Sequence, residues 1–420
     1  MALLPCAFRF RLEPTAEQAA QLGRLAGARR WVWNWALERR TATYRADGKS
    51  VSWAALSAEL TGLKQAPAMA WLAEVDSQAL QQALADLKRA FANFFESRAR
   101  FPRRKTRKRS RPAFRIPQRV RLDGGRLYVP GAGWVRVRRA RAEDGTFAEI
   151  GPTKSARFTC DAGGRWHVAL VGARHVEEGP FPLPPEAAAA GMDQGLTTFA
   201  VLSDGATVAN PRFGRRADRK LRRLHRAVSR KVKGSRNRGK ARRALAREYG
   251  RVRDRRQDFA AKLATQLITA YPVLGVESLN VSALARTKLS RSVLDAAWGD
   301  LHRRLHYKAA WWGGGPDGRT GRWVIPVGRW FPSTKRCSVC HRRNPDLTLA
   351  DRTWSCGQCA SVHDRDGNAS ENLRQEAWRL LANGLLGKGH EDQQGAAGGQ
   401  PDARNASGPR VRPSTAGTAG

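Results

Sequence analysis

Two Cys-x-x-Cys pairs constrain this chain more than any other local pattern. The first pair is Cys337 and Cys340, the second is Cys356 and Cys359, and residues 341–355 separate the pairs. Each pair can offer two thiolates to adjacent corners of a tetrahedral Zn²⁺ site, and the separation lies at the short end of the ribbon pattern. Because four thiolates leave no open coordination position, the predicted zinc site is structural and not catalytic.

Two alternatives remain for the cysteine block. A redox pair is disfavoured, because redox motifs do not come as two pairs at ribbon spacing. The residue after the second cysteine often needs a positive φ, which favours glycine, but here those positions hold His341 and Ala360. His341 therefore competes as a ligand. The other cysteines, Cys6 and Cys160, are expected to be buried core thiols.

The charge of the chain points to a polyanionic partner. Its 420 residues include 76 Lys and Arg against 36 Asp and Glu, a formal net charge of +40. Self-repulsion destabilises so charged a compact chain unless an anion neutralises it, so nucleic acid is the expected partner and an acidic membrane surface the weaker one. We expect no membrane span, because no apolar run approaches the ~18 residues needed, and no signal peptide.

Two segments carry much of the excess positive charge. Residues 98–111 read RARFPRRKTRKRSR, and residues 215–256 show apolar residues at helical spacing among arginines and lysines, broken by a glycine turn. The second segment predicts a helical hairpin. A solvated surface is the alternative for both, but charges of almost one sign favour phosphate contact. The predicted nucleic-acid contacts are Arg103, Arg104, Lys105, Arg107, Lys108, Arg109, Arg230, Lys231, Lys233, Arg236, Arg238 and Lys240.

The first half of the chain alternates between strand and helix patterns. Residues 1–13 and 113–178 read as short strands of one small β-barrel or sheet. Residues 14–112 read as a helical block inserted into it, with a capping-box pattern at Thr15 and Gln18. A proline-rich linker follows and marks a domain boundary.

Three carboxylates stand out in the second half. Asp193 follows a strand and precedes a glycine turn, Glu277 ends an apolar strand, and Asp366 precedes the last helix. Alone, each is more typical of a turn or a cap. Together they fit a ribonuclease H-like sheet, which brings acids from distant segments to one place. Converging carboxylates bind two Mg²⁺ or Mn²⁺ ions, one to generate the attacking hydroxide and one to stabilise the leaving oxygen.

The predicted fold class is therefore multidomain α+β. A ribonuclease H-like α/β domain is expected over residues 186–330 and 361–386, with the zinc ribbon inserted at 331–360. Residues 387–420 lack periodicity and are expected to form a disordered tail.

Nine stretches carry a family resemblance through their order and spacing, between about Phe8 and Leu373. They are FRFRLEPTAEQ, RWVWNWALERR, FPRRKTRKRSRPAF, GMDQGLTTFAV, LHRAVSRKVKGSRNRGKARRALAREYGRVRDRRQDF, GVESLNV, LHYKAAWWG, FPSTKRCSVC and HDRDGNASENL. The chain resembles the TnpB family, the OrfB-type proteins of insertion sequences related to type V CRISPR effector nucleases. Departures are small: the ribbon lacks its usual glycines, and Ser370 stands where the family more often has alanine.

The resemblance implies an RNA-guided DNA endonuclease with a single RuvC-like site. A guide RNA from the element would pair with one strand of a double-stranded DNA target, and the protein would read a short adjacent motif. The catalytic acids of the family transfer to Asp193, Glu277 and Asp366, with Asp364 as a rival for the third. The strand and helical segments at the start would be the wedge and recognition domains.

The resemblance leaves two other functions open. One is a conventional DNA transposase that uses the same carboxylates, and the other is a nuclease-inactive RNA-guided repressor that only binds DNA. The expected location is the prokaryotic cytoplasm with the nucleoid, without membrane contact. A monomer is the expected form.

Overall fold

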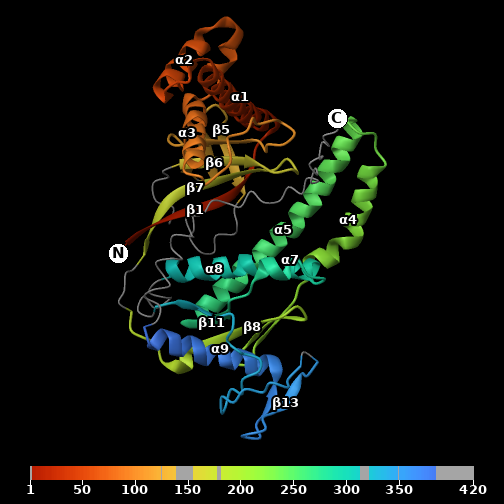
Figure 1. Ribbon diagram of the computed structural model, residues 1–420. Helices are drawn as coiled ribbons and strands as arrows, with labels where there is room; N and C mark the ends of the chain where they lie inside the picture. Colours follow the sequence, from red (N-terminus) through yellow and green to blue (C-terminus); the bar gives the residue numbers. More distant parts are fainter. Residues whose placement is uncertain are drawn as a thin grey trace, which may run out of the picture.

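Two sheets dominate the computed structural model, which describes residues 2–123, 125–138, 155–176, 181–312, 321–348 and 350–384. Figure 1 shows a helical block and one sheet at one end, and the other sheet between helices at the opposite end. The tail predicted over 387–420 lies outside the described residues. Within the described part of the chain, no helix is long and apolar enough to cross a membrane.

The first sheet is antiparallel and joins both ends of the N-terminal half. Its order is β2-β6-β7-β1-β5-β4-β3. The strands are β1 (Ala2–Glu13), β2 (Ala113–Ile116), β3 (Arg121–Asp123), β4 (Arg126–Val129), β5 (Gly133–Arg138), β6 (Ser155–Cys160) and β7 (Trp166–Val176). The first strand lies in the middle of the sheet, between β7 and β5. The helical block is therefore an insertion between β1 and β2, as the strand pattern predicts.

The edges of this sheet do not meet. β2 and β3 stand at its two ends, and no pairing among the described residues joins them. Of the two predicted forms, a small barrel or a sheet, the described residues show a sheet, and the barrel is not confirmed. Its buried face, which includes Phe114, Phe158 and Leu170, packs against the start of the first helix.

The inserted block consists of α1 (Ala16–Asp47), α2 (Trp53–Gln65), the 3₁₀ helix η1 (Pro67–Leu72) and α3 (Ser77–Phe95). The predicted capping box is present, because the Thr15 side chain accepts from Gln18 N and the Gln18 side chain accepts from Thr15 N. α1 ends at Gly48, whose φ of 66° suits glycine. Leucines of α2 and α3 bury against α1 as a separate core.

The second sheet is mixed, in the order β10-β9-β8-β11-β12. Its strands are β8 (Ala189–Gln194), β9 (Thr198–Leu202), β10 (Thr207–Ala209), β11 (Val273–Glu277) and β12 (Trp323–Val327), preceded by η2 (Glu186–Ala188). β8, β11 and β12 run parallel, whereas β9 is antiparallel to β8 and β10 is antiparallel to β9. The parallel strands are buried almost throughout, because helices cover both faces.

Helices α5 (Arg236–Ala270) and α8 (Trp298–Trp311) cover one face of the mixed sheet, and α9 (Arg365–Ala382) covers the other (Figure 1). Two glycines allow α9 to come close. A Cβ at Gly191 would overlap the carbonyl oxygen of Ser370, and one at Gly275 would overlap that of Leu373. The backbone of α9 therefore lies directly on β8 and β11.

The predicted basic hairpin is formed by α4 (Phe213–Ser229) and α5. Its turn includes Gly234 at φ 93°, and the Ser235 side chain caps α5. α5 also reaches the first sheet: Arg165, in the turn after β6, donates to Asp254 at 2.6 Å. The short helices α6 (Val281–Leu284) and α7 (Ser290–Ala296) precede α8. The hairpin thus links the two halves of the molecule (Figure 1).

The cysteine block forms a small separate unit next to the start of α9. It contains the antiparallel pair β13 (Thr353–Ser355) and β14 (Val362–Asp364), and an isolated bridge between Arg336 and Arg343. Figure 1 shows β13 at the far end of the molecule from the helical block.

Candidate active site and metal centre

The three predicted acids come from three elements that meet at one edge of the mixed sheet. Asp193 lies near the end of β8 and Glu277 ends β11. Because these strands are parallel, with Met192 opposite Val276, the two carboxylates emerge at the same edge. Asp366 lies in the first turn of α9, which crosses the same strands.

The acids act on one another electrostatically. The pKa of Asp193 is raised to about 7, first by burial and then by the negative charges of Glu277 and Asp366, against the opposing charge of Arg365. Burial also raises the pKa of Glu277, while a hydrogen bond from Ser333 opposes it. This pattern is typical of carboxylates gathered for a cation, which would relieve their repulsion.

The three carboxylates lie in the same region, but their oxygen atoms do not form one tight cluster. Among the described residues, the four cysteines form a group whose ligand atoms all lie within 4.8 Å of one another, and the three carboxylates do not. Asp366 meanwhile contacts Arg352 at 3.5 Å and Arg365 at 3.3 Å. Carboxylate oxygens are nevertheless the type of ligand that Mg²⁺ prefers, and this ion keeps several waters and needs few protein ligands.

The structure separates Asp366 from its rival. Asp364 is the N-cap of α9, and its carboxylate accepts a hydrogen bond from Gly367 N at 2.8 Å. It is exposed and does not contribute to the raised pKa of Asp193, whereas Asp366 does. Capping accounts for Asp364, whereas the charge of Asp366 acts on Asp193.

The four predicted zinc ligands come together. Cys337 Sγ lies 3.6 Å from Cys359 Sγ, and Cys340 Sγ lies 3.5 Å from Cys356 Sγ. Because all four sulfurs form one cluster, the donor set fits a tetrahedral zinc ion.

The residues that replace the ribbon glycines have the backbone that the pattern predicts. His341 has φ 66° and Ala360 has φ 58°, the left-handed region that glycine adopts without strain. His341 is exposed and lies outside the cysteine cluster. A different histidine touches a ligand: His363 Nε2 lies 3.1 Å from Cys337 Sγ, a contact that sequence reasoning missed.

Buried amides join the cysteine block to α9. Asn368 Nδ2 donates to Arg336 O at 2.7 Å, and its Oδ1 accepts from Ser338 N at 2.9 Å. Asn372, which is 1% exposed, donates to Ser333 O and Arg336 O. The asparagines thus hold the segment before and within the first cysteine pair against the helix that carries Asp366.

The same segment reaches the second acid. The Ser333 hydroxyl donates to Glu277 Oε1 at 3.2 Å, and its carbonyl accepts from Asn372 at 2.8 Å. Sequence reasoning missed Ser333, Asn368 and Asn372. The only available signal was the spacing of two asparagines on one face of the final helix.

Another missed contact lies behind Asp193. Buried Gln194 pairs with His302 of α8 at 2.5 Å between Oε1 and Nε2. Burial, with a smaller effect of His306, lowers the pKa of His302 to about 4, so the imidazole is neutral near pH 7. This pair connects the end of β8 to α8.

The basic arm is held against α1 and does not extend freely. Asn34 bonds both the N–H and the carbonyl of Lys105 at 2.7 and 2.8 Å, and Trp33 Nε1 donates to Arg103 O at 3.0 Å. Lys105 Nζ lies 3.2 Å from the centre of the Trp33 ring. Burial, and then the charges of Arg29 and Arg157, lower the pKa of Lys105 to about 7.

The other predicted cations are mostly exposed. Arg103, Arg104, Arg107, Lys108 and Arg109 face solvent along the arm. At the tip of the hairpin, Arg230, Lys231, Lys233, Arg236 and Lys240 are exposed, while Arg238 is half-buried and donates to Lys231 O at 2.9 Å. No ion pair within the described ranges involves these hairpin residues.

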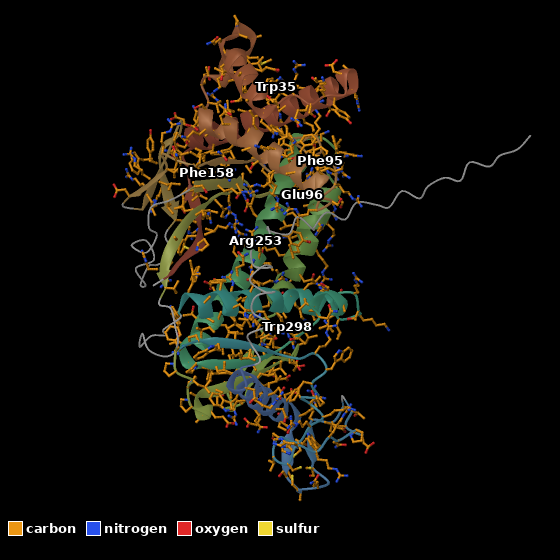
Figure 2. The ribbon with its side chains drawn as sticks, turned by 60° about the vertical axis from the view of Figure 1, so that its left-hand side comes forward. Trp35, Phe95, Glu96, Phe158, Arg253 and Trp298 are labelled. Atoms are coloured by element: carbon orange, nitrogen blue, oxygen red, sulfur yellow. The ribbon has the colours of Figure 1, made fainter. Side chains whose placement is uncertain are left out.

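A large basic cleft lies between the two halves of the molecule, with a volume of about 1260 Å³. Figure 2 shows Arg253 between the sheet that carries Phe158 and the helix that carries Trp298. The cationic lining residues are Arg9, Arg11, Arg29, Arg30, Lys105, Arg111, Arg157, Arg253, Arg303 and Arg304, against Asp161 and Asp254. Of these, only Lys105 belongs to the predicted contacts.

These features define a multidomain protein of helices and sheets in which an acid-bearing mixed sheet adjoins a four-cysteine unit. Family models match in three places: "Probable transposase" (OrfB_IS605) over 175–288, "Helix-turn-helix domain" over 1–49, and "Cas12f1-like, TNB domain" over 298–373. Residues 1–49 contain one strand and one long helix here.

Two relatives match most of the chain in sequence. A "Putative RNA-guided DNA endonuclease" of Streptomyces pristinaespiralis is 40% identical over 370 residues, which cover 87% of this chain and 88% of that protein. "Putative RNA-guided DNA endonuclease InsQ" of Escherichia coli (strain K12) is 32% identical, covering 90% and 94%. The chain therefore belongs to this family of OrfB-type insertion-sequence proteins, to which TnpB belongs.

A solved structure also matches in outline. "Cryo-EM structure of the Cas12f1-sgRNA-target DNA complex" aligns with a TM-score of 0.46 and 12% identity, covering 89% of this chain and 99% of that one.

Proposed function

We propose that this protein is an RNA-guided DNA endonuclease that hydrolyses phosphodiester bonds at Asp193, Glu277 and Asp366. The observation that carries the proposal is the shared electrostatic field of these three acids at one sheet edge. The names of the relatives support the reaction class, and the net charge of +40 supports a nucleic-acid substrate.

The three carboxylates fit a divalent cation, and their oxygen ligands indicate which ions would bind. Asp193, Glu277 and Asp366 would hold Mg²⁺ or Mn²⁺, whose positive charge activates water and stabilises the leaving oxygen when bound. Ser333 orients Glu277, and the Gln194–His302 pair fixes the strand end beside Asp193. Arg365 balances part of the negative charge at Asp366.

The remaining parts divide the work of binding. The basic cleft, the arm and the hairpin tip would hold guide RNA and its double-stranded DNA target through phosphate contacts. Zn²⁺ at Cys337, Cys340, Cys356 and Cys359 would be structural, because four thiolates close the site.

The chain divides into domains that match these roles. Residues 1–13 and 113–178 form a wedge-like domain, and residues 14–112 form a recognition domain. The RuvC-like nuclease part spans 186–330 and 361–386 around a ribbon at 331–360. We place the protein in the prokaryotic cytoplasm with the nucleoid, as a monomer.

The test uses the full-length protein with the RNA that co-purifies. Sequencing that RNA, followed by cleavage of a plasmid library with randomised flanks in Mg²⁺, should give cuts at sites that match the RNA. Cuts that ignore the RNA sequence would indicate a conventional transposase. Tight matched binding without cuts in any divalent metal would indicate a repressor.

Two neighbouring acids provide a matched pair of variants. Asp366→Asn should abolish cleavage and retain DNA binding, because it removes one negative ligand from the site. Asp364→Asn should cleave like the wild type, because asparagine caps a helix about as well as aspartate. Equal loss of cleavage in both variants would contradict the assignment of Asp366.

A further inference from the structure

The turn after β12 presents an almost fully exposed tryptophan. Phe331 N donates to Gly328 O at 2.9 Å, which places Arg329 and Trp330 at the tip of the turn. Trp330 is 89% exposed, the highest value for a large hydrophobic side chain in the described part of the chain. An exposed indole face is a large apolar surface on which another ring can stack.

This turn lies beside the acid edge. β12 runs parallel to β11, with Val327 opposite Glu277, and Ser278 N donates to Val327 O. The turn begins at the next residue, Gly328. Glu277 and Trp330 line the same groove, whose volume is about 650 Å³. A ligand that fills this groove would therefore contact both the indole and Glu277.

The groove combines cations with apolar surface. Arg329 and Arg343 line it and are exposed, and neither forms an ion pair with any residue that the structure describes. Lys335 adds a third cation, bonded to Pro345 O at 2.7 Å. Phosphates pair with such side chains and an unpaired base stacks on an indole, whereas a duplex keeps its base faces covered.

We propose that Trp330 is a stacking platform for one unpaired base of the DNA strand that enters the site at Glu277. The proposal rests on the proposed nuclease function and names the form of the substrate at that site: single-stranded, with a base stacked on the indole and a phosphate near Arg329 or Arg343.

The test measures stacking directly, in a background that cannot cut. The full-length, RNA-loaded protein carrying Asp193→Ala is titrated with a short oligodeoxynucleotide that contains 2-aminopurine, whose fluorescence falls on stacking. Salt at ~0.3 M suppresses the general electrostatic binding of so basic a chain. Adding Trp330→Ala should weaken binding about fivefold or more and remove the quenching. Trp330→Phe should keep both within about twofold.

Trp134→Ala is the matched control, because Trp134 is 41% exposed but lies on β5 of the other sheet. It should bind like the parent. Binding by Trp330→Ala equal to that of the parent would overturn the proposal, as would equal weakening in Trp330→Ala and Trp330→Phe. A groove that takes a protein partner instead would show no quenching in any variant, which also overturns it.

A second readout separates this proposal from the proposed function. With Asp193 intact, Trp330→Ala should raise the half-saturating concentration of single-stranded DNA and leave kcat within about twofold. Absence of cleavage by the wild type would count against the nuclease function while the stacking titration still decides the role of Trp330.

Discussion

Replacing Asp193 by asparagine should stabilise the metal-free protein while it abolishes cleavage. The folded state raises the pKa of this carboxyl from 3.8 to about 7, through burial and the charges of Glu277 and Asp366. Asparagine has nearly the same shape and carries no charge, so it removes the repulsion. An ionised carboxyl with this difference in pKa destabilises the folded state by on the order of 4 kcal/mol.

The stabilisation by Asp193→Asn should depend on pH, in a direction and over a range that the two pKa values of Asp193 define. The folded pKa lies above the unfolded one, so the folded protein holds the proton more tightly. The contribution of Asp193 to stability is therefore greatest below pH 3.8 and falls as pH rises toward about 7. The gain from Asp193→Asn should be about 4 kcal/mol at pH 8 and should shrink to about 2 kcal/mol at pH 5.

Unfolding by denaturant, monitored by fluorescence, measures the stability gain of Asp193→Asn at each pH. The protein is zinc-loaded and contains no other divalent ions. Asp364→Asn is the control and should change stability by less than about 0.5 kcal/mol. Added Mg²⁺ should raise the stability of the wild type and have less effect on Asp193→Asn. No gain at pH 8, or the same gain at pH 5 and pH 8, would refute the shared field of the acids.

Two further predictions concern contacts outside the acid group. Asn372→Ala should lower the free energy of unfolding by about 2 kcal/mol, because it leaves the buried carbonyl of Ser333 without its donor and removes one of the two amide bonds to Arg336 O. Gln375→Ala, which gives up part-buried bonds, should cost less than half as much. Equal losses would contradict the idea that Asn372 holds the cysteine block against α9. The nucleic-acid affinity of the wild type should decline about threefold between pH 6 and 8, because the Lys105 ammonium loses its charge near pH 7. Lys105→Met should not show this decline. Equal pH profiles of the two proteins in a filter-binding assay would contradict this prediction.

Local signals predicted the elements that position the site. The Thr15 capping box, the four cysteines and the strand ends at Asp193 and Glu277 are patterns within a few residues, and the structure contains each of them. The positive φ at His341 followed in the same way from the geometry of the cysteine pair. Such patterns depend on short-range backbone chemistry, which the sequence displays directly.

Contacts between distant segments were not predictable in this way. The basic cleft combines Arg9, Arg253 and Arg303, which lie on a strand and two helices far apart in the chain. Lys105 looked like one more charge of an exposed arm, but Asn34 and Trp33 draw it toward the protein. Charge runs show where cations are abundant, whereas tertiary packing decides which of them share a surface.

The final helix is held from two sides, and this determines how the acids assemble. On the sheet side, Gly191 lets the backbone of α9 lie directly on β8. On the ribbon side, Asn368 and Asn372 fix the same helix to the first cysteine pair. Because Asp366 lies in the first turn of α9, both sets of contacts hold it near Asp193 against their mutual repulsion. The contacts of the cysteine unit with α9 therefore help to hold Asp366 beside Asp193.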